Sequence, residues 1–301
     1  MQFGRVNDSL LSNIDFSLPD PPDNKLVLPG QPAANLSVYV GCPRWGMKEW
    51  VGTLYPKGTK EANYLEEYPH HFNCIEFNAT HYKIYDPGTI GKWKARVNRK
   101  DFKFCPKVPQ SISHYSSLVN AQDQTTAFLE GILALEENLG PVFLQLGENY
   151  SPNRRENLYK YLQSLPTDLS WYLELRHPDW FTNPATTKEL FDTLRQLKIG
   201  AVITDTAGRR DCVHMQLPTP GSMVRFVGNS LHPTDYKRMD EWVLRIDKWI
   251  KNGLQELYFF MHMQDDMSYI DASIYFIDKL KEVSGISIPK PVFQPKQQSL
   301  F

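Results

Sequence analysis

The chain has 301 residues, of which 41% are hydrophobic and 22% are charged, and its formal net charge is -1. This composition excludes a wholly disordered chain, because it can bury a sizeable core, and the near-neutral charge excludes a global attraction to nucleic acid or to acidic membranes. The length allows one large α/β barrel or two ordinary domains.

Residues 1–35 are predicted to form an arm rather than a domain. The stretch SLPDPPDNKLVLPGQP is dense in proline and has too few periodic apolar positions for a helix or a strand. We expect this arm to run over the surface of one domain, residues 36–285, which is followed by a C-terminal tail, residues 286–301.

From residue 36 onward, strand-like runs alternate with helix-like segments, which predicts parallel strands joined by right-handed crossovers. The predicted strands are Ser37–Val40, Cys74–Asn78, Phe102–Lys107, Val142–Leu146, Trp171–Leu175, Ala201–Thr204, Met223–Phe226 and Tyr258–Met261. Helical spacing of apolar residues, with a glycine just beyond each end, predicts the helices Gln122–Asn138, Thr186–Lys198, Thr234–Asn252 and Asp271–Val283.

Eight strands over roughly 250 residues are the count and size of a TIM barrel. We therefore predict the α/β class and a (β/α)8 barrel, with an irregular or missing helix between the sixth and seventh strands, where AGRRDCVHMQLPTPGS reads as a long loop. The alternative is an open doubly wound sheet, but no Gly-rich phosphate loop follows an early strand.

The segment Trp171–Phe181 shows how ionisable groups collect at a strand end. Glu174 and Arg176 share one face of the fifth strand by the period-two rule, and His177 follows before Pro178 ends the strand. Other predicted strands end in the same way, and parallel barrels place their chemistry at this rim.

Reading the strand ends in order yields the candidate site. The candidate catalytic residues are Glu76, Lys107, His114, Glu174 and His177. The candidate substrate-binding residues are Arg44, Trp45, Asn78, Tyr82, Gln145, Arg176, Trp180, Asp205, Arg225 and His262. The arginines and Lys107 favour an anionic group on the ligand, since guanidinium groups grip phosphate or carboxylate at two points.

Two alternatives stay open at this point. The charged residues could neutralise one another as a purely structural network. A divalent metal could be held by Glu174, His177, Asp205 and His262, although no HxH or HExxH spacing supports it. We predict no cofactor and no metal.

Several segments resemble one known family. VGCPRWGMKEWVGTLYP, IEFNATHYKIYDPGTIGKWKARVNRKDFKFCPKVPQSISH, LELRHPDWF, ITDTAG and VRFVGN, in this order, are similar to the motifs of the YecE-like family, the domain of unknown function 72. The resemblance implies a TIM barrel and marks Glu76, Asn78, Tyr82, Lys107, His114, Glu174, Arg176, His177, Trp180, Asp205 and Arg225 as matched pocket positions. It implies no reaction. The chain departs from the family pattern at CPRWG, at MHMQDD and in its long N-terminal arm.

The last five residues, QQSLF, resemble the peptide by which bacterial polymerases and repair proteins dock on the sliding clamp. Gln297, Ser299, Leu300 and Phe301 match that pattern, and Gln298 stands where leucine is usual. A flexible tail ending in Leu-Phe could anchor in an apolar groove.

The leading hypothesis is an enzyme that binds a small anionic or sugar-like substrate at the strand ends, with acid/base chemistry by Glu and His. The alternatives are a DNA-metabolism accessory protein recruited to the clamp and a non-catalytic ligand-binding barrel. Four scattered cysteines without a CxxC pair fit a reducing cytoplasm. The chain shows no signal-peptide pattern and no apolar run near the ~18 residues that a membrane span needs.

Overall fold

The computed structural model describes residues 3–295. It contains eight parallel strands in the order β3-β2-β1-β8-β7-β6-β5-β4. The strands are β1 (Ser37–Cys42), β2 (Cys74–Phe77), β3 (Lys103–Pro106), β4 (Val142–Gln145), β5 (Trp171–Glu174), β6 (Gly200–Asp205), β7 (Gly221–Val227) and β8 (Glu256–His262). All eight predicted strands are confirmed, with ends that differ by a few residues.

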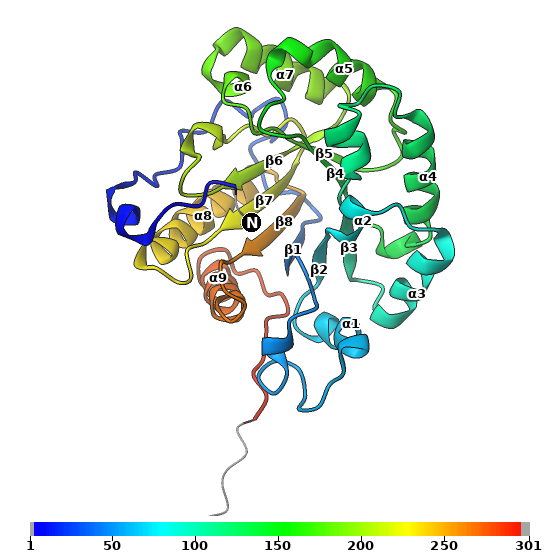
Figure 1. The fold of residues 1–301 in the computed structure, drawn as a ribbon. Helices are drawn as coiled ribbons and strands as arrows, with labels where there is room; N and C mark the ends of the chain where they lie inside the picture. The colour runs from blue at the N-terminus through cyan, green and yellow to red at the C-terminus, as the bar shows by residue number, and fades with distance from the viewer. Residues whose placement is uncertain (1–2, 296–301) are drawn as a thin grey trace, which may run out of the picture.

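A seam between β3 and β4 nearly closes the sheet into a barrel. Two isolated bridges join the strands here, Phe104 with Leu139 and Lys107 with Phe143. The Val108 amide also donates to the Phe143 carbonyl at 3.0 Å. With the helices arranged around the strands (Figure 1), this is the predicted (β/α)8 barrel.

The helices lie outside the barrel. They are α1 (Tyr64–Glu67), α2 (Ala79–Tyr82), α3 (Pro87–Val97), α4 (Gln122–Leu133), α5 (Arg155–Gln163), α6 (Asp179–Thr182), α7 (Pro184–Gln196), α8 (Pro233–Asn252) and α9 (Ser268–Ser284). Short turns add η1 (Asp8–Asn13), η2 (Lys48–Trp50), η3 (Glu61–Asn63), η4 (Tyr68–His70), η5 (Ser111–Tyr115), η6 (Glu136–Asn138), η7 (Pro152–Arg154) and η8 (Arg210–Cys212).

Most helix predictions hold, with two notable outcomes. The helix predicted over Gln122–Asn138 stops at Leu133, because Glu136 adopts a left-handed φ of 47° that an α-helix cannot continue. Between β6 and β7 the described chain forms only the single turn η8, which confirms the predicted irregular connection.

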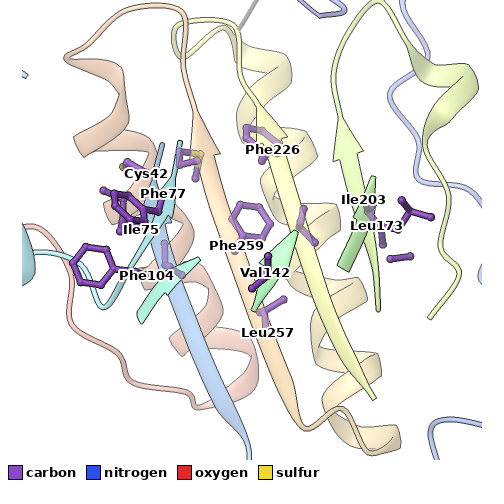
Figure 2. Close-up of a cluster of buried hydrophobic side chains, with 14 of the residues drawn as sticks. Cys42, Ile75, Phe77, Phe104, Val142, Leu173, Ile203, Phe226, Leu257 and Phe259 are labelled. Carbon is purple, nitrogen blue, oxygen red and sulfur yellow. The ribbon is translucent and has the colours of Figure 1, made fainter. Parts of the chain in front are cut away.

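The strands separate two apolar regions. The large core lies between the outward faces of the strands and the helices, and Figure 2 shows part of it, including Phe259, Phe226 and Ile203. A second cluster fills the barrel itself and consists of Cys74, Cys105, Phe143, Tyr172, Val202, Met223, Tyr258 and Phe260. This inner cluster plugs the barrel, as in other small barrels of parallel strands.

The N-terminal arm docks on the barrel instead of hanging free. The described arm runs beside α8 and reaches toward the barrel centre (Figure 1). The carbonyl of Gly4 accepts from the Gly208 amide at 2.8 Å and from the Thr206 hydroxyl at 3.1 Å. Farther along, Leu11 and Phe16 are buried against Ala207.

Two sequence-based expectations concern the C-terminal peptide and membrane-spanning segments. The QQSLF peptide, with Gln297, Ser299, Leu300 and Phe301, lies outside them. Over residues 3–295, no helix has the length and apolar character to cross a membrane.

Candidate functional site

A polar layer lies directly above the apolar plug of the barrel. On seven strands, the residue two positions beyond an inner-cluster residue is polar or charged: Glu76 follows Cys74, Lys107 follows Cys105, Gln145 follows Phe143, Glu174 follows Tyr172, Thr204 follows Val202, Arg225 follows Met223 and His262 follows Phe260. Because strand side chains alternate between faces, these seven point to the barrel interior at its carboxyl end.

Arg225 is the centre of this layer. Its Nε and Nη2 donate to the two carboxylate oxygens of Glu76, at 2.9 and 2.7 Å, and its Nη1 donates to Glu174 Oε2 at 2.7 Å. The fork-to-carboxylate geometry toward Glu76 is the strongest arrangement an arginine can make with a carboxylate. The network thus ties β2, β5 and β7 together.

Three further side chains complete the network. Arg176 Nε donates to Glu174 Oε1 at 2.6 Å. His262 Nε2 lies 2.8 Å from Glu76 Oε2, and the Asn78 amide donates to Glu76 Oε1 at 2.8 Å. A carboxylate oxygen can only accept, so His262 donates through Nε2.

The two acids are ionised and fully engaged. Burial on its own would raise the pKa of Glu76, but the charges of Arg225 and His262 outweigh it and hold that pKa well below the ordinary value. Burial likewise opposes ionisation of Glu174, yet Arg176 and Arg225 lower its pKa to about 2. Both carboxylates are therefore held in the charged form near neutral pH.

Lys107 differs from the arginines of this layer because it has no carboxylate partner among the described residues. Its side chain is buried, and its Nζ donates to Gln145 Oε1 at 2.7 Å. No carboxylate oxygen of the described residues lies within 4.0 Å of this Nζ. Burial, and next the charge of Arg225, lower the pKa of Lys107 to about 7.

A pocket of about 500 Å³ opens above this layer. Its lining residues are Pro43, Arg44, Asn78, Tyr82, Lys107, Gln145, Arg176, Arg225, His262, Met263, Gln264 and Tyr269. Four of these side chains are cationic and none is a carboxylate, because Glu76 and Glu174 lie behind the arginines with 0 and 1% exposure. The pocket wall therefore presents positive charge to a ligand.

Asp205 does not belong to this pocket. It lies on the opposite face of β6 from the barrel interior and is buried against α8, where Trp242 Nε1 donates to it at 2.8 Å and Arg238 Nη2 lies 3.0 Å away. Arg210 also pairs with it. These partners, rather than a substrate, occupy the carboxylate that we placed in the site.

Four other candidates lie outside the pocket wall. Trp180 is completely buried and donates to the Tyr150 carbonyl at 2.8 Å. Trp45 packs between Phe77 and Trp93.

His177 lies 3.7 Å from Asp179 instead of facing the network. Burial first, and next the charge of Lys107, lower the pKa of His114. The Ser113 hydroxyl lies 2.8 Å from the His114 Nδ1. A second imidazole, His81, lies 5.3 Å from His114 between ring centres. It follows the second strand in the sequence, but it was not among the candidate site residues.

Sequence reasoning also missed contributors from distant segments. The ring of Phe3, in the arm, covers the guanidinium of Arg176, with 4.1 Å between the Arg176 Cζ and the ring centre. No periodicity in the arm indicates this contact. Gln264, by contrast, follows the eighth strand, and the strand-end rule could have found it.

The donor set does not resemble a metal centre. Glu174 and His262 point to the barrel interior, whereas Asp205 faces α8, so the residues of the metal alternative do not converge. Among residues 3–295, no group of three His, Cys, Asp or Glu side chains has the spacing to hold a metal ion.

Comparison with known proteins places the chain in a family. Residues 39–298 match the family model described as protein of unknown function DUF72. The chain belongs to this family. The DUF72 match begins after the N-terminal arm, so the arm and its contact with Arg176 lie outside it.

Individual relatives agree with this assignment. The chain is 29% identical over 246 residues to UPF0759 protein YecE of Escherichia coli, an alignment that covers 76% of this chain and 87% of that protein. A DUF72 family protein of Enterococcus faecalis shares the fold with a TM-score of 0.67 at 18% identity, over 87% of this chain and 100% of that one. A DUF72 family protein of Thermotoga maritima has a TM-score of 0.62 at 23% identity, over 82% and 98% of the two chains.

Proposed function

We propose that this DUF72 protein is an enzyme that binds a small anionic substrate, bearing phosphate or carboxylate, at the carboxyl ends of the barrel strands. The observation that carries the proposal is Lys107: a buried lysine without a carboxylate partner among the described residues, on a pocket wall that also holds Arg44, Arg176 and Arg225. Buried ammonium groups are normally paired, so the substrate anion would supply the missing countercharge.

The proposed roles differ from those expected from the sequence. Glu76 and Glu174 position Arg225 and Arg176, because both carboxylates are consumed by these arginines. Lys107, with its pKa near 7, exchanges protons with the substrate, since catalytic acids and bases work best when their pKa lies near the operating pH.

The two histidines predicted as catalytic residues, His114 and His177, differ in the support for that role. The electrostatic influence of Lys107 on His114 supports a part for that imidazole in proton transfer. His177 has no comparable support, because it pairs with Asp179.

Anion titration of two matched variants tests the binding site. Lys107→Gln removes the charge of Lys107 from the pocket, and Lys103→Gln removes one from the other end of the same strand, where Lys103 Nζ donates to the Glu137 carbonyl at 2.6 Å. Inorganic phosphate, sulfate and malonate are titrated by calorimetry and by thermal shift. A charge-assisted hydrogen bond contributes about 1.5–3 kcal/mol, so Lys107→Gln should weaken at least one anion by about 10- to 100-fold.

Stability without anion separates loss of binding from loss of folding. The unfolded chain keeps the Lys107 proton up to a pKa of 10.5, whereas the folded chain releases it near pH 7. The unfolded state therefore binds more protons between these values, and the stability contributed by Lys107 rises with pH across this window and is lowest below pH 7. Lys107→Gln should accordingly be at least as stable as the wild type at pH 6.

Two results would count against the proposal. Equal anion affinity in Lys107→Gln and Lys103→Gln would remove the binding site. Anion binding at this pocket without turnover of any phosphate or carboxylate ester, sugar phosphate or keto acid would instead favour the non-catalytic ligand-binding barrel.

A further inference from the structure

Lys107 differs from the other lysines of the protein. It is the single buried lysine among residues 3–295, and its Nζ is held by one amide oxygen, that of Gln145 at 2.7 Å. Several lysines on the surface pair with carboxylates instead, as Lys188 does with Asp192 and Lys290 with Asp278. Burial of the Lys107 amine without a carboxylate partner within 4.0 Å favours its neutral form.

We propose that Lys107 is a nucleophilic amine that forms a reversible imine with a small carbonyl compound bearing a carboxylate or a phosphate. This inference rests on the proposed function, because the same cationic wall would hold the anionic group of the compound. It adds the substrate class: a keto acid or a phosphorylated aldehyde or ketone.

The position of Lys107 suits this chemistry. The backbone of Lys107 bridges to Phe143 across the barrel seam, and its side chain ends in the pocket wall beside Gln145. Arg176 and Arg225 line the same pocket and can hold an anion while a carbonyl carbon meets Nζ. A buried amine in an anion-binding pocket is the arrangement that activates lysine for attack on carbonyl substrates.

The surroundings of Lys107 set its protonation. Burial is the largest influence, followed by repulsion from Arg225 on β7. Attraction by the carboxylates of Glu174 and Glu76 raises the pKa of Lys107, whereas repulsion by Arg176 lowers it.

Two neutral imidazoles lie within the electrostatic reach of Lys107. Burial and next the charge of Lys107 lower the pKa of His81 to about 4 and also lower that of His114. Neither histidine therefore competes with Lys107 as a cation near pH 7.

The step balances without an external oxidant or reductant. The Nζ lone pair of the neutral amine attacks the carbonyl carbon, a C–N bond forms, and the carbonyl oxygen takes a proton while the nitrogen loses one, which gives a carbinolamine. The hydroxyl group then takes a second proton and leaves as water, and the nitrogen loses its remaining proton. The product is the C=N bond of an imine, and hydrolysis reverses the sequence. We assign these proton transfers to His114, because this imidazole is close enough to Lys107 for the charge of the lysine to lower its pKa.

Reductive trapping on the full-length protein tests the imine. The protein is incubated with sodium cyanoborohydride and glyoxylate, pyruvate, glyceraldehyde 3-phosphate or uncharged glyceraldehyde, and the modified lysines are mapped by peptide mass spectrometry. Hydride from the borohydride converts an imine into a stable secondary amine at the attacked lysine.

We expect Lys107 to be labelled at least tenfold faster than Lys103 at pH 7, with the charged carbonyl compounds preferred over glyceraldehyde. The rate at Lys107 should rise with a midpoint near pH 7, while the rate at surface lysines keeps rising above pH 9. Inorganic phosphate should slow the labelling. Lys107→Arg should abolish it, and the wild-type ratio of Lys107 to Lys103 labelling remains decisive if that variant folds poorly.

The outcomes separate the two proposals. Labelling of Lys107 that does not exceed that of Lys103, in a protein that still binds phosphate, overturns the imine and leaves the anion site standing. Fast labelling of Lys107 by glyceraldehyde, with no advantage for the charged compounds and no phosphate binding, supports the reactive amine and overturns the anion site.

Discussion

At the scale of single residues, the site depends on how a small number of buried charges are paired. Glu76, Glu174, Arg176 and Arg225 sum to zero and satisfy one another through short hydrogen bonds. Lys107 adds an amine whose Nζ has no carboxylate oxygen within 4.0 Å among the described residues, so its protonated form is not balanced there. The site therefore combines a charge-balanced network of four side chains with one unpaired amine, a combination suited to ligand binding.

Replacing Glu174 tests this pairing through acid sensitivity. The pKa of Glu174 is lowered to about 2 in the fold from an ordinary 4.5. Its stabilisation is therefore complete above pH 4.5 and is lost as the pH falls toward 2. Glu174→Gln leaves Arg176 and Arg225 undercompensated and should cost about 3–5 kcal/mol at pH 7.

The control is Glu66→Gln, a change at an exposed acid, which should stay within about 0.5 kcal/mol of the wild type. Both variants are unfolded with urea at pH 7 and pH 3. The deficit of Glu174→Gln should narrow at pH 3, and a deficit that is the same at both pH values would contradict the assigned ionisation.

At the scale of elements, the N-terminal arm is one of the features in which this chain departs from its family pattern, and the family match begins after it. Its docking combines backbone bonds with arginine–aromatic contacts, since Phe3 covers Arg176 and Phe16 lies 4.9 Å from the Arg238 guanidinium. Each such contact contributes about 0.5–2 kcal/mol, depending on how well it is shielded from water. An element outside the family match thus contacts a residue of the pocket wall.

Substitution of alanine for two glycines of the arm, Gly4 and Gly30, tests which contacts hold the arm on the barrel. Gly4 has a φ of +67°, and a Cβ there would lie 2.4 Å from the Thr206 side chain. Gly30 has a φ of +84° but open space around its Cβ position. Alanine at either site incurs the left-handed backbone cost of about 1–2 kcal/mol, whereas only Gly4→Ala also adds a steric clash.

Hydrogen exchange and limited proteolysis measure the consequence. Gly4→Ala should raise exchange and cleavage in residues 3–16 by at least tenfold, while Gly30→Ala should leave that segment protected. Equal protection of residues 3–16 in both variants would show that the Gly4 contact does not hold the arm.

At the scale of the whole molecule, the barrel has one weak line of closure. β7 and β8 pair continuously from Gly221 with Glu256 to Val227 with His262, whereas β3 and β4 meet only through isolated bridges. The catalytic candidate Lys107 sits on this seam. Opening of the barrel should therefore begin beside the proposed site.

Amide exchange of two equivalent residues measures the difference. The Val108 amide donates across the seam to Phe143 at 3.0 Å, and the Gly228 amide donates from just beyond β7 to His262 at 2.7 Å. Both lie just past the carboxyl end of a strand. Residue-resolved exchange should be at least tenfold faster at Val108, which corresponds to about 1.4 kcal/mol less opening free energy. Similar rates would mean that the seam is as stable as the regular ladder.

The sequence by itself determined the barrel and the ring of polar residues at its carboxyl rim. Alternation with a period of two is a local property, so Glu174 and Arg176 had to share a face wherever the strand was placed. The count of strand-like runs and the helices between them likewise depend on local patterns. The family motifs point to the same barrel.

Only the tertiary structure decided what these residues contact. Whether Asp205 faces the barrel or a helix depends on the orientation of the strand in the closed sheet, and β6 turns it toward α8. Whether an acid is a catalyst or a structural partner depends on distances across 149 residues of chain, as between Glu76 and Arg225. The isolation of Lys107 and the cover of Arg176 by Phe3 are likewise results of packing between distant segments, because charge pairing and burial are set by neighbours in space.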